Sequence, residues 1–512
     1  MRKTSLIVCF SLVLTICSSI VNSEANGATE SDLISAPSSG PGPGGYTRLL
    51  FQQEVGTHNY SVLPTELNDS YISVLPICGG GRKSECVESL EYREATNQEW
   101  KKAELTPRLN PNMSGIQAFR WPDNALQFYG DVTANQSTYR PAGATSRTWK
   151  LADATHAGGN EYLLSVTVSD LHETGRKNFN QSLSASLRAV KWITPPPYGK
   201  WDKTENSIVE FNLPTEIEFR VNINLGFLDG KLSNWYNGRL SNPAVTKANG
   251  ILSISAKAVT VPIGGTDFFT CSSLTDKKRD YFQSRTFPGE DFFTGPMCND
   301  RSGSSLGTSS ADANAFKAFE AFESDLKEFG KNSYWSFEAT SNAFNFCKTN
   351  NIAGFVSSDA MIYTKEPPYF NSATSQLSYR IASTHQDKSG TLNRGKFHLV
   401  ISQSVAECLW QLNPTELSTA VVQVVYSDGQ PIVGTSTLKT ESGWVYINVD
   451  NFTFSAPTLN VTLSNKSPAE RVVNAPSSAP VIKKRTIICI KGKSTKKITG
   501  INPKCPTGFK KK

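Results

Sequence analysis

"EIEFRVNINL" (216–225) alternates apolar and polar residues along its length. Successive side chains of a strand point to opposite faces, so one face of this segment would be apolar and the other polar. The apolar face would carry Ile217, Phe219, Val221 and Ile223, and the polar face Glu216, Glu218, Arg220 and Asn222. This pattern predicts an antiparallel strand with one face on a core and the other in water.

Similar strand patterns occur on both sides of this segment. They are "EYLLSVTVSD" (161–170), "GILSISAKAVTVPI" (250–263) and "GWVYINVDNFTF" (443–454). "TAVVQVVYSDGQPIVGTSTL" (419–438) places two apolar runs around Asp428-Gly429, which is typical of a β-hairpin. With 36 Gly and 27 Pro in the chain, this rhythm predicts a mainly β fold of two or three antiparallel, immunoglobulin-like β-sandwich domains.

One helix is expected within this β-rich chain, over residues 311–329. Its apolar residues recur at helical spacing: Phe316, Phe319, Phe322, Leu326 and Phe329. Ser309 with Asp312 resembles a capping box, and Gly330 would end the helix. A phenylalanine stripe of this kind is more often a core face than a ligand site, so we expect it to pack inside.

Composition divides the 512 residues into seven ranges. The first 23 residues resemble a secretory signal, because Arg2 and Lys3 precede a short apolar run and Val21-Asn22-Ser23 offers a cleavage site. The ranges are a signal peptide (1–23), a Gly/Pro/Ser linker (24–45), an N-terminal β domain (46–200), a central β domain with the helix (201–402), a C-terminal β-sandwich portion (403–465), a linker (466–482) and a basic module (483–512). We therefore expect an exported protein, extracellular or associated with the cell envelope, that is not integral to the membrane.

Cysteine usage agrees with export. Removing Cys9 and Cys17 with the signal from the ten cysteines leaves an even number, which favours disulfides over zinc. Proximity in sequence suggests the pairs Cys78–Cys86, Cys271–Cys298, Cys347–Cys408 and Cys489–Cys505.

Charge is distributed unevenly along the chain. Residues 483–512 hold eleven of the 52 basic residues and no acidic residue. Without these and the two of the signal, 39 basic residues remain against 45 acidic ones, so the body is mildly acidic. A terminal block of basic residues of this kind usually binds a polyanion.

Motifs for catalysis or cofactor binding are absent from the sequence. There is no H-E-x-x-H or G-x-S-x-G, and Gly492-Lys493 lacks the first glycine of a phosphate loop because Ile487 stands there. Carboxylate pairs exist at Glu216 with Glu218 and at Glu290 with Asp291, but solvated strand charges are commoner than catalytic pairs. The sequence therefore assigns no catalytic, cofactor-binding or metal-binding residue, and enzymatic activity stays open.

Aromatic residues suggest one candidate ligand contact, in "NWYNGRLSNP" (234–243). Trp235 and Tyr236 must face opposite sides if the chain is extended there, with Gly238 and Arg239 in a turn. An exposed aromatic ring beside Arg239 could bind carbohydrate. The alternative, which tryptophan and tyrosine favour in general, is that the rings are packed and Arg239 pairs locally.

The tail "RTIICIKGKSTKKITGINPKCPTGFKKK" (485–512) is the strongest functional signal. Strand-like "TIICIK" and "KKITGI" flank a turn at 492–495, which predicts a small hairpin closed by Cys489–Cys505. The residues expected to bind a polyanion are Lys491, Lys493, Lys496, Lys497, Lys504, Lys510, Lys511 and Lys512. Aromatic residues other than Phe509 are absent from the basic part, which argues against specific nucleic-acid binding.

The tail closely resembles a C-terminal module found on exported proteins of actinobacteria. The shared features are Cys-x-Lys-Gly-Lys, a Thr-Lys-Lys hinge and Lys-Cys-Pro-x-Gly-Phe-Lys-Lys-Lys, all within 485–512. Parts of the body, such as "WYNGRLSNP" (235–243) and "GFVSSDAMI" (354–362), resemble large uncharacterised secreted proteins of the same bacteria. The resemblance implies a compartment but no reaction.

Two functional hypotheses follow. The first is a secreted, surface-associated β-domain protein with a binding or envelope-structural role, whose basic tail holds it to an anionic wall or surface polymer. The alternative is a secreted hydrolase acting on polysaccharide, with accessory β domains. A tail that is a processed sorting signal would be a third outcome.

Overall fold

The computed structural model describes most of the chain between residue 71 and residue 464, together with the C-terminal module. The described residues are 49–51, 71–109, 146–170, 181–193, 207–266, 274–283, 306–308, 313–341, 343–344, 346–347, 352–411, 419–425, 431–433, 435–454, 458–464, 485–492, 494–500, 505 and 508–511. The predicted signal peptide, both predicted linkers, Cys271, Cys298, Glu290 and Asp291 lie outside these residues.

The chain forms two compact units, Met1–Ser464 and Asn465–Lys512. Both are built mainly of β-strands, and the described residues include three short helices, α3 (Asp276–Gln283), α4 (Ala313–Phe322) and α5 (Gln403–Trp410). The mainly β character and the antiparallel sheets that the sequence predicts are confirmed.

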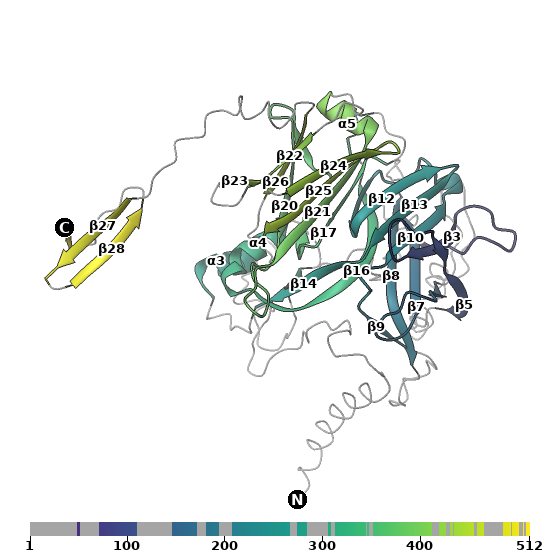
Figure 1. The fold of residues 1–512 in the computed structure, drawn as a ribbon, viewed down its shortest axis with the longest axis horizontal. Helices are drawn as coiled ribbons and strands as arrows, with labels where there is room; N and C mark the ends of the chain where they lie inside the picture. Colours follow the sequence, from purple (N-terminus) through teal and green to yellow (C-terminus); the bar gives the residue numbers. More distant parts are fainter. Residues whose placement is uncertain are drawn as a thin grey trace, which may run out of the picture. The chain divides into compact units, whose positions relative to one another are not determined.

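The largest sheet takes strands from early and late parts of the described residues of the first unit (Figure 1). Its strand order is β24 (Thr435–Glu441), β25 (Trp444–Thr453), β21 (Arg394–Ser402), β17 (Gly354–Ser358), β11 (Trp235–Arg239), β16 (Lys327–Ser341), β8 (Ser182–Ile193), β7 (Glu161–Asp170), β6 (Arg147–Lys150) and β5 (Glu104–Leu109). Five further strands pair off this path: β1 (Leu49–Phe51), β2 (Tyr71–Val74), β9 (Ser207–Phe211), β14 (Val259–Gly265) and β15 (Leu306–Thr308). This sheet therefore takes strands from all three β ranges that the sequence analysis separates.

A second sheet has five strands, and the segment 216–225 supplies its middle. The order is β12 (Ser241–Ala248), β13 (Ile251–Lys257), β10 (Glu218–Asn224), β3 (Cys86–Arg93) and β4 (Lys101–Lys102). Ile217, Phe219, Val221 and Ile223 are buried, as the alternation predicts. Asn249 and Gly250 join β12 to β13 with φ of 52° and 76°, the positive pair that a tight hairpin turn of primed type requires.

One apolar cluster lies between these two sheets. Phe219 and Val221 of β10 belong to it together with Tyr162 and Trp335 of the large sheet. The rings of Tyr162 and Phe219 lie 5.7 Å apart, and the indole N–H of Trp335 donates to the carbonyl of Ala256 at 3.0 Å. Burial of each such side chain is worth about 1.5–3 kcal/mol, so this shared cluster is what holds the two sheets face to face.

The opposite face of the large sheet is covered by a third sheet. Its order is β18 (Ile362–Tyr363), β20 (Gln376–Ala382), β26 (Thr458–Ser464), β22 (Thr419–Val425) and β23 (Pro431–Val433), with β19 (Tyr369–Asn371) beside β20. Trp235 and Phe397 of the large sheet share an apolar cluster with Tyr379 and Val461 of the third. β22 and β23 pair antiparallel, which confirms the hairpin expected around Asp428-Gly429; the two turn residues lie outside the described residues.

The predicted helix is present but shorter than expected. Phe316, Phe319 and Phe322 are buried, as a core-facing stripe should be. The helix ends at Phe322, and the residues from 327 onward form strand β16, so the extension to residue 329 and the Gly330 cap are wrong. Phe329 lies in that strand with 37% of its surface exposed. Residues 327–334 pair with β14 as part of strand β16, and this pairing requires an extended backbone. The helical spacing of the apolar residues therefore does not produce a helix there.

Three disulfides fall at expected positions, and each has a Cα–Cα distance normal for the bond. Cys78–Cys86 closes a loop before β3, and Cys347–Cys408 ties the segment after β16 to α5. Cys489–Cys505 lies in the second unit.

Candidate functional site

The C-terminal module is a three-stranded antiparallel sheet. β27 (Arg485–Lys491) lies between β28 (Ser494–Gly500) and β29 (Lys510–Lys511). Gly492 takes φ of 59° at the turn, a left-handed conformation that glycine adopts without steric cost. The expected hairpin is confirmed, and β29 is an additional strand that sequence patterning did not indicate because it spans only two lysines.

A disulfide closes this small sheet at its centre. Cys489 lies in the middle of β27, is fully buried and is bonded to Cys505. A unit of this size cannot build a large apolar core, so covalent closure supplies much of its stability. Closing a loop of about 15 residues contributes roughly 3 kcal/mol in the chain-entropy model. The disulfide therefore holds the lysines of the module on a fixed frame.

The lysines of the module are exposed wherever the structure describes their side chains. These are Lys491, Lys496, Lys497, Lys510 and Lys511. The other predicted polyanion ligands, Lys493, Lys504 and Lys512, lie outside the described residues.

Strand register distributes these charges over both faces of the module. Lys496 and Lys511 both lie opposite Cys489 and therefore share its face. Lys497 lies opposite Ile488, and Lys510 lies opposite Ile490, on the other face. The Nζ of Lys496 also lies 5.4 Å from the ring of Phe509. Because residues 483–512 hold no acidic side chain, no ion pair within the module neutralises these cations.

Trp235, Tyr236 and Arg239 lie in the interior. Trp235 and Tyr236 do face opposite sides, since each belongs to the apolar cluster on a different face of the large sheet. The ring of Tyr236 stacks on Phe355, and the indole N–H of Trp235 donates to the Lys365 carbonyl at 3.2 Å. A role in contacting a ligand at the surface does not fit this burial, and the packed alternative describes both rings.

Arg239 is held by backbone carbonyls and lies in a strand, so the expected turn at Gly238 and Arg239 is wrong. Its guanidinium donates to the carbonyls of Ser358 and Met361 at 2.8 and 2.9 Å, and it lies 4.8 Å from the ring of Tyr363. Burial lowers the pKa of Arg239, while burial raises the pKa of the neighbouring Asp359 to about 7. These contacts make Arg239 a structural clamp for the segment that follows β17.

The two carboxylates of the pair Glu216 and Glu218 differ in burial and in partners. Glu218 is buried and accepts a hydrogen bond from Arg93 at 2.8 Å, whereas Glu216 precedes β10 and is exposed. The two carboxylates therefore have different surroundings, and Glu218 serves an ion pair.

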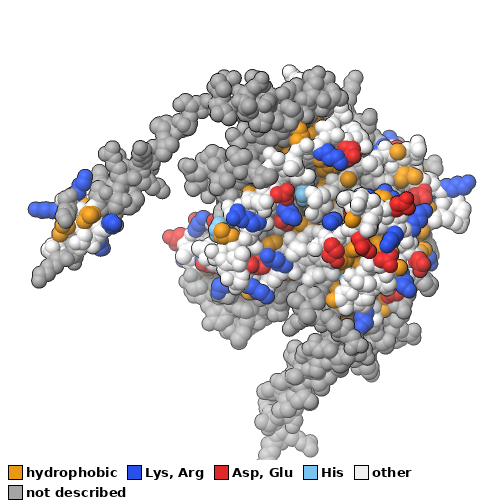
Figure 2. Space-filling view, viewed as in Figure 1, with side chains coloured by type: hydrophobic (Ala, Val, Ile, Leu, Met, Phe, Trp, Pro, Cys, Tyr) orange, Lys and Arg blue, Asp and Glu red, His pale blue; other side chains and the backbone are white. Residues whose placement is uncertain are grey.

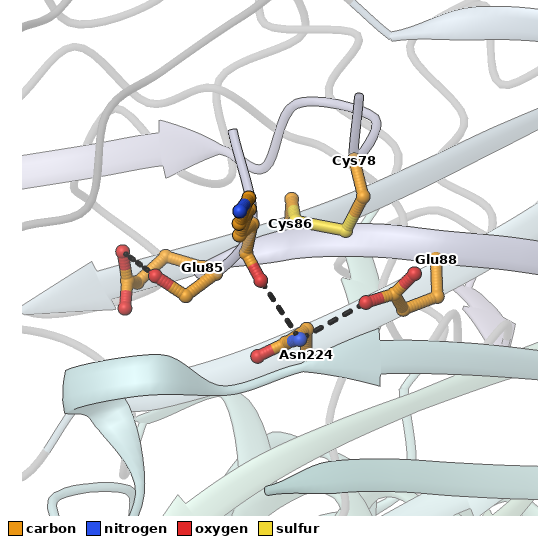
Figure 3. The surroundings of a disulfide bond; sticks show 7 residues. Cys78, Glu85, Cys86, Glu88 and Asn224 are labelled. Carbon is orange, nitrogen blue, oxygen red and sulfur yellow. Dashed lines mark hydrogen bonds between the residues drawn. A yellow bond between two sulfur atoms is a disulfide. The ribbon is translucent and has the colours of Figure 1, made fainter. Parts of the chain in front are cut away.

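Cys78, Cys86 and Glu88 place their ligand-type atoms within 4.8 Å of one another, as a metal site would (Figure 3). Both sulfurs are joined in the Cys78–Cys86 disulfide, so neither is a thiolate that could bind an ion. The Glu88 carboxylate instead accepts a hydrogen bond from the side chain of Asn224 at 2.9 Å, drawn as a dashed line in Figure 3. This cluster is thus a structural element at the start of β3.

Within the part of the chain that the structure describes, no helix has the length and apolar character needed to span a membrane. No protein-family model matches the chain, and a search of curated proteins finds no match either. The resemblance of the tail to an actinobacterial module stays a prediction.

Proposed function

We propose that this chain binds an anionic wall or surface polymer through its C-terminal module and is thereby held at the cell surface. The observation that carries the proposal is a disulfide-closed sheet with exposed lysines and no acidic side chain between residues 483 and 512. A cation that has no acidic side chain within its module is available to an external anion. A rigid frame also reduces the ordering cost of presenting several cations at once.

A polymer suits this arrangement better than a small anion. The lysines lie on both faces of the sheet and do not converge on one point, as a pocket for a single phosphate would require. A chain of repeated negative charges can contact several of them together and release counterions at each contact. Lysine contributes a point charge and not a geometric fork, so the interaction would select charge density over a particular chemical structure.

We propose that the first compact unit, Met1–Ser464, is the part of the protein displayed at the cell surface. Two sheets that share one apolar cluster support a β-sandwich, and we extend this to the immunoglobulin-like architecture that the strand rhythm indicates. The disulfides support an oxidising compartment, and we propose a secreted, envelope-associated location. The hydrolase alternative gains no support from the carboxylate pair Glu216 and Glu218, because Glu218 is buried and pairs with Arg93, and the pair Glu290 and Asp291 lies outside the described residues.

The proposal is tested by neutralising lysines in the full chain. Variant one carries Lys496→Gln, Lys497→Gln, Lys510→Gln and Lys511→Gln. The matched control carries Lys83→Gln, Lys102→Gln, Lys150→Gln and Lys388→Gln, four exposed lysines of the body, so both proteins lose the same charge. Binding to a poly(glycerol phosphate) and to a carboxylated polysaccharide would be measured by titration calorimetry at fixed salt.

The expected result is an increase in Kd of about tenfold or more for the module variant, since each lysine near an anionic surface contributes about 1 kcal/mol. The body control should stay within about twofold of the unmodified chain. Equal weakening by the two variants would mean that only net charge matters, and the module would lose its assigned role. Weakening for the phosphate polymer alone would identify wall polymer as the source of the anion.

A further inference from the structure

A groove of about 480 Å³ runs across the outer face of the five-stranded sheet, the face turned away from the apolar cluster. Side chains of β3, β10, β12 and β13 line it, among them Glu88, Ser89, Arg220, Asn222, Thr246 and Ser253. Its volume lies within the range of about 300–1,000 Å³ that small-molecule sites occupy. Figure 2 shows acidic and basic side chains interspersed over the region where Figure 1 places this sheet.

A row of polar side chains crosses four strands of the sheet in register. Thr246 lies opposite Ser253, Ser253 opposite Asn222, and Asn222 opposite Ser89. The Ser253 hydroxyl donates to Asn222 Oδ1 at 2.5 Å, and Asn222 Nδ2 donates to Ser89 Oγ at 2.8 Å. These hydrogen bonds fix the orientation of the Asn222 amide, so the row is ordered before any ligand arrives.

Charged residues and one tryptophan hold Arg220, which lines the groove, in place. Arg220 Nε donates to Glu91 at 2.7 Å, and Glu91 also accepts from the Ser89 hydroxyl at 3.0 Å. The guanidinium groups of Arg220 and Arg93 lie 4.1 and 4.2 Å from the ring of Trp100, which is half-buried. The stack holds Arg220 in a single position.

A β-bulge directs one more acceptor into the groove. Ile223 pairs with Val87 and Asn222 pairs with Ser89, so Glu88 is an extra residue in β3. Bulges redirect side chains and are frequent beside functional sites. Asn224 donates to Glu88 Oε1 at 2.9 Å and to the Lys83 carbonyl at 3.0 Å, and the Cys78–Cys86 disulfide lies beside them (Figure 3). The disulfide thus braces this end of the groove.

The groove still has hydrogen-bonding capacity for a ligand. Among the residues that the structure describes, the side chains of Thr246 and Asn249 form no hydrogen bond. β10 and β13 are inner strands whose backbone groups pair with neighbours on both sides, so a peptide could not add to them as a strand. Recognition must therefore come from hydroxyl, amide and carboxylate side chains.

These groups select against most other ligand classes. The charge of Arg220 is balanced by Glu91, which disfavours a phosphate or sulfate. Hydroxyl and amide groups that both donate and accept hydrogen bonds match a ligand that carries many hydroxyl groups, as a saccharide does. We infer that this groove binds a neutral saccharide.

This inference is independent of polyanion binding, because the groove belongs to the first compact unit and the lysines to the second. Full chain would be titrated with neutral oligosaccharides of glucan, mannan and chitin type. Asn222→Ala removes the central amide, and Thr246→Phe fills the groove at an exposed position without touching the core. Asn460→Ala is the matched control, because Asn460 also bridges two strands through a hydrogen bond to Ser378, at 2.7 Å.

At least one oligosaccharide should bind the unmodified chain. Asn222→Ala should increase the Kd about tenfold because a hydrogen bond to the ligand is lost, and Thr246→Phe should do the same because the new ring fills the groove. Asn460→Ala should leave the Kd within about twofold. Failure of every neutral oligosaccharide to bind would overturn the inference. Binding that survives both groove substitutions would overturn it too. The module lysine variant should bind sugar normally, so failure of one proposal leaves the other intact.

Discussion

His156 shows how burial and hydrogen bonds fix the protonation state of one side chain. The backbone N–H of Gly158 donates to Nδ1 at 3.1 Å, so the ring proton lies on Nε2, which is 3.0 Å from the Glu161 carbonyl. The rings of Tyr162 and Phe211 lie 5.1 and 5.4 Å away. Burial lowers the pKa of His156 to about 4.

This lowered pKa makes stability depend on pH in a definite direction. The unfolded chain takes up a proton near pH 6.5, whereas the folded chain does so near 4, so the free energy of unfolding falls as pH decreases between these values. At pH 5 the loss relative to pH 7.5 should be about 2 kcal/mol. In the His156→Gln variant, the free energy of unfolding should not show this loss of about 2 kcal/mol between pH 7.5 and pH 5. Urea unfolding of both proteins at the two pH values measures it, and an unchanged pH dependence in the variant would refute the assignment.

Residue positions were predictable only where local periodicity governs them. The opposite facing of Trp235 and Tyr236 follows from strand geometry alone. The fate of Arg239 does not, because its carbonyl partners on Ser358, Ala360 and Met361 lie 119 to 122 positions later in the chain. The groove was missed for the same reason, since Ser89, Asn222 and Ser253 meet only through strand pairing.

At the scale of the element, β11 is the most enclosed strand that carries a candidate residue from the sequence. All five of its residues are buried, and it lies between β16 and β17. A Cβ on Gly238 would lie 2.7 Å from the Phe355 ring and 2.8 Å from the Ser336 carbonyl. The backbone oxygen cannot move away cheaply, so glycine is needed there for packing.

Gly238→Ala should therefore destabilise the protein by about 1–3 kcal/mol through overpacking. Gly330→Ala in β16 is the matched control, because a Cβ at that position meets no atom within 4 Å. Its effect should stay within about 0.5 kcal/mol. Denaturant midpoints of the two variants provide the comparison. If Gly238→Ala and Gly330→Ala destabilised the protein equally, the enclosure of β11 would not be the cause of the Gly238→Ala effect.

Secondary-structure elements were predictable where a single sequence pattern applied and no long-range strand pairing contradicted it. The strand at 216–225 has a clear period of two, the tail has two strand-like segments around a turn, and both elements are present. The helical spacing of the phenylalanines continues past Phe322, but the pairing of β16 with β14 from Lys327 onward makes that stretch a strand. Short α3 and α5 gave no strong periodic signal, so sequence reasoning missed them.

At the scale of the whole molecule, the sequence could not reveal which strands are neighbours. β11 pairs with β16 and, in parallel, with β17, although about 100 residues separate them in the chain. The division between an acidic body and a basic terminal module needed only counting, and the second compact unit, Asn465–Lys512, contains all eleven of those basic residues. Charge composition is thus informative where long-range pairing is not.

The central claim is that the module's lysines bind a polyanion by direct charge contact. The measurement that tests it most directly is the slope of log K against log [NaCl] for the full chain and poly(glycerol phosphate). Substituting glutamine for Lys496, Lys497, Lys510 and Lys511 should reduce the magnitude of that slope by about 0.7 per lysine, roughly 3 in total, because each lysine–anion contact releases counterions. An unchanged slope in this variant, or an equal reduction in the four-lysine body control, would contradict the account.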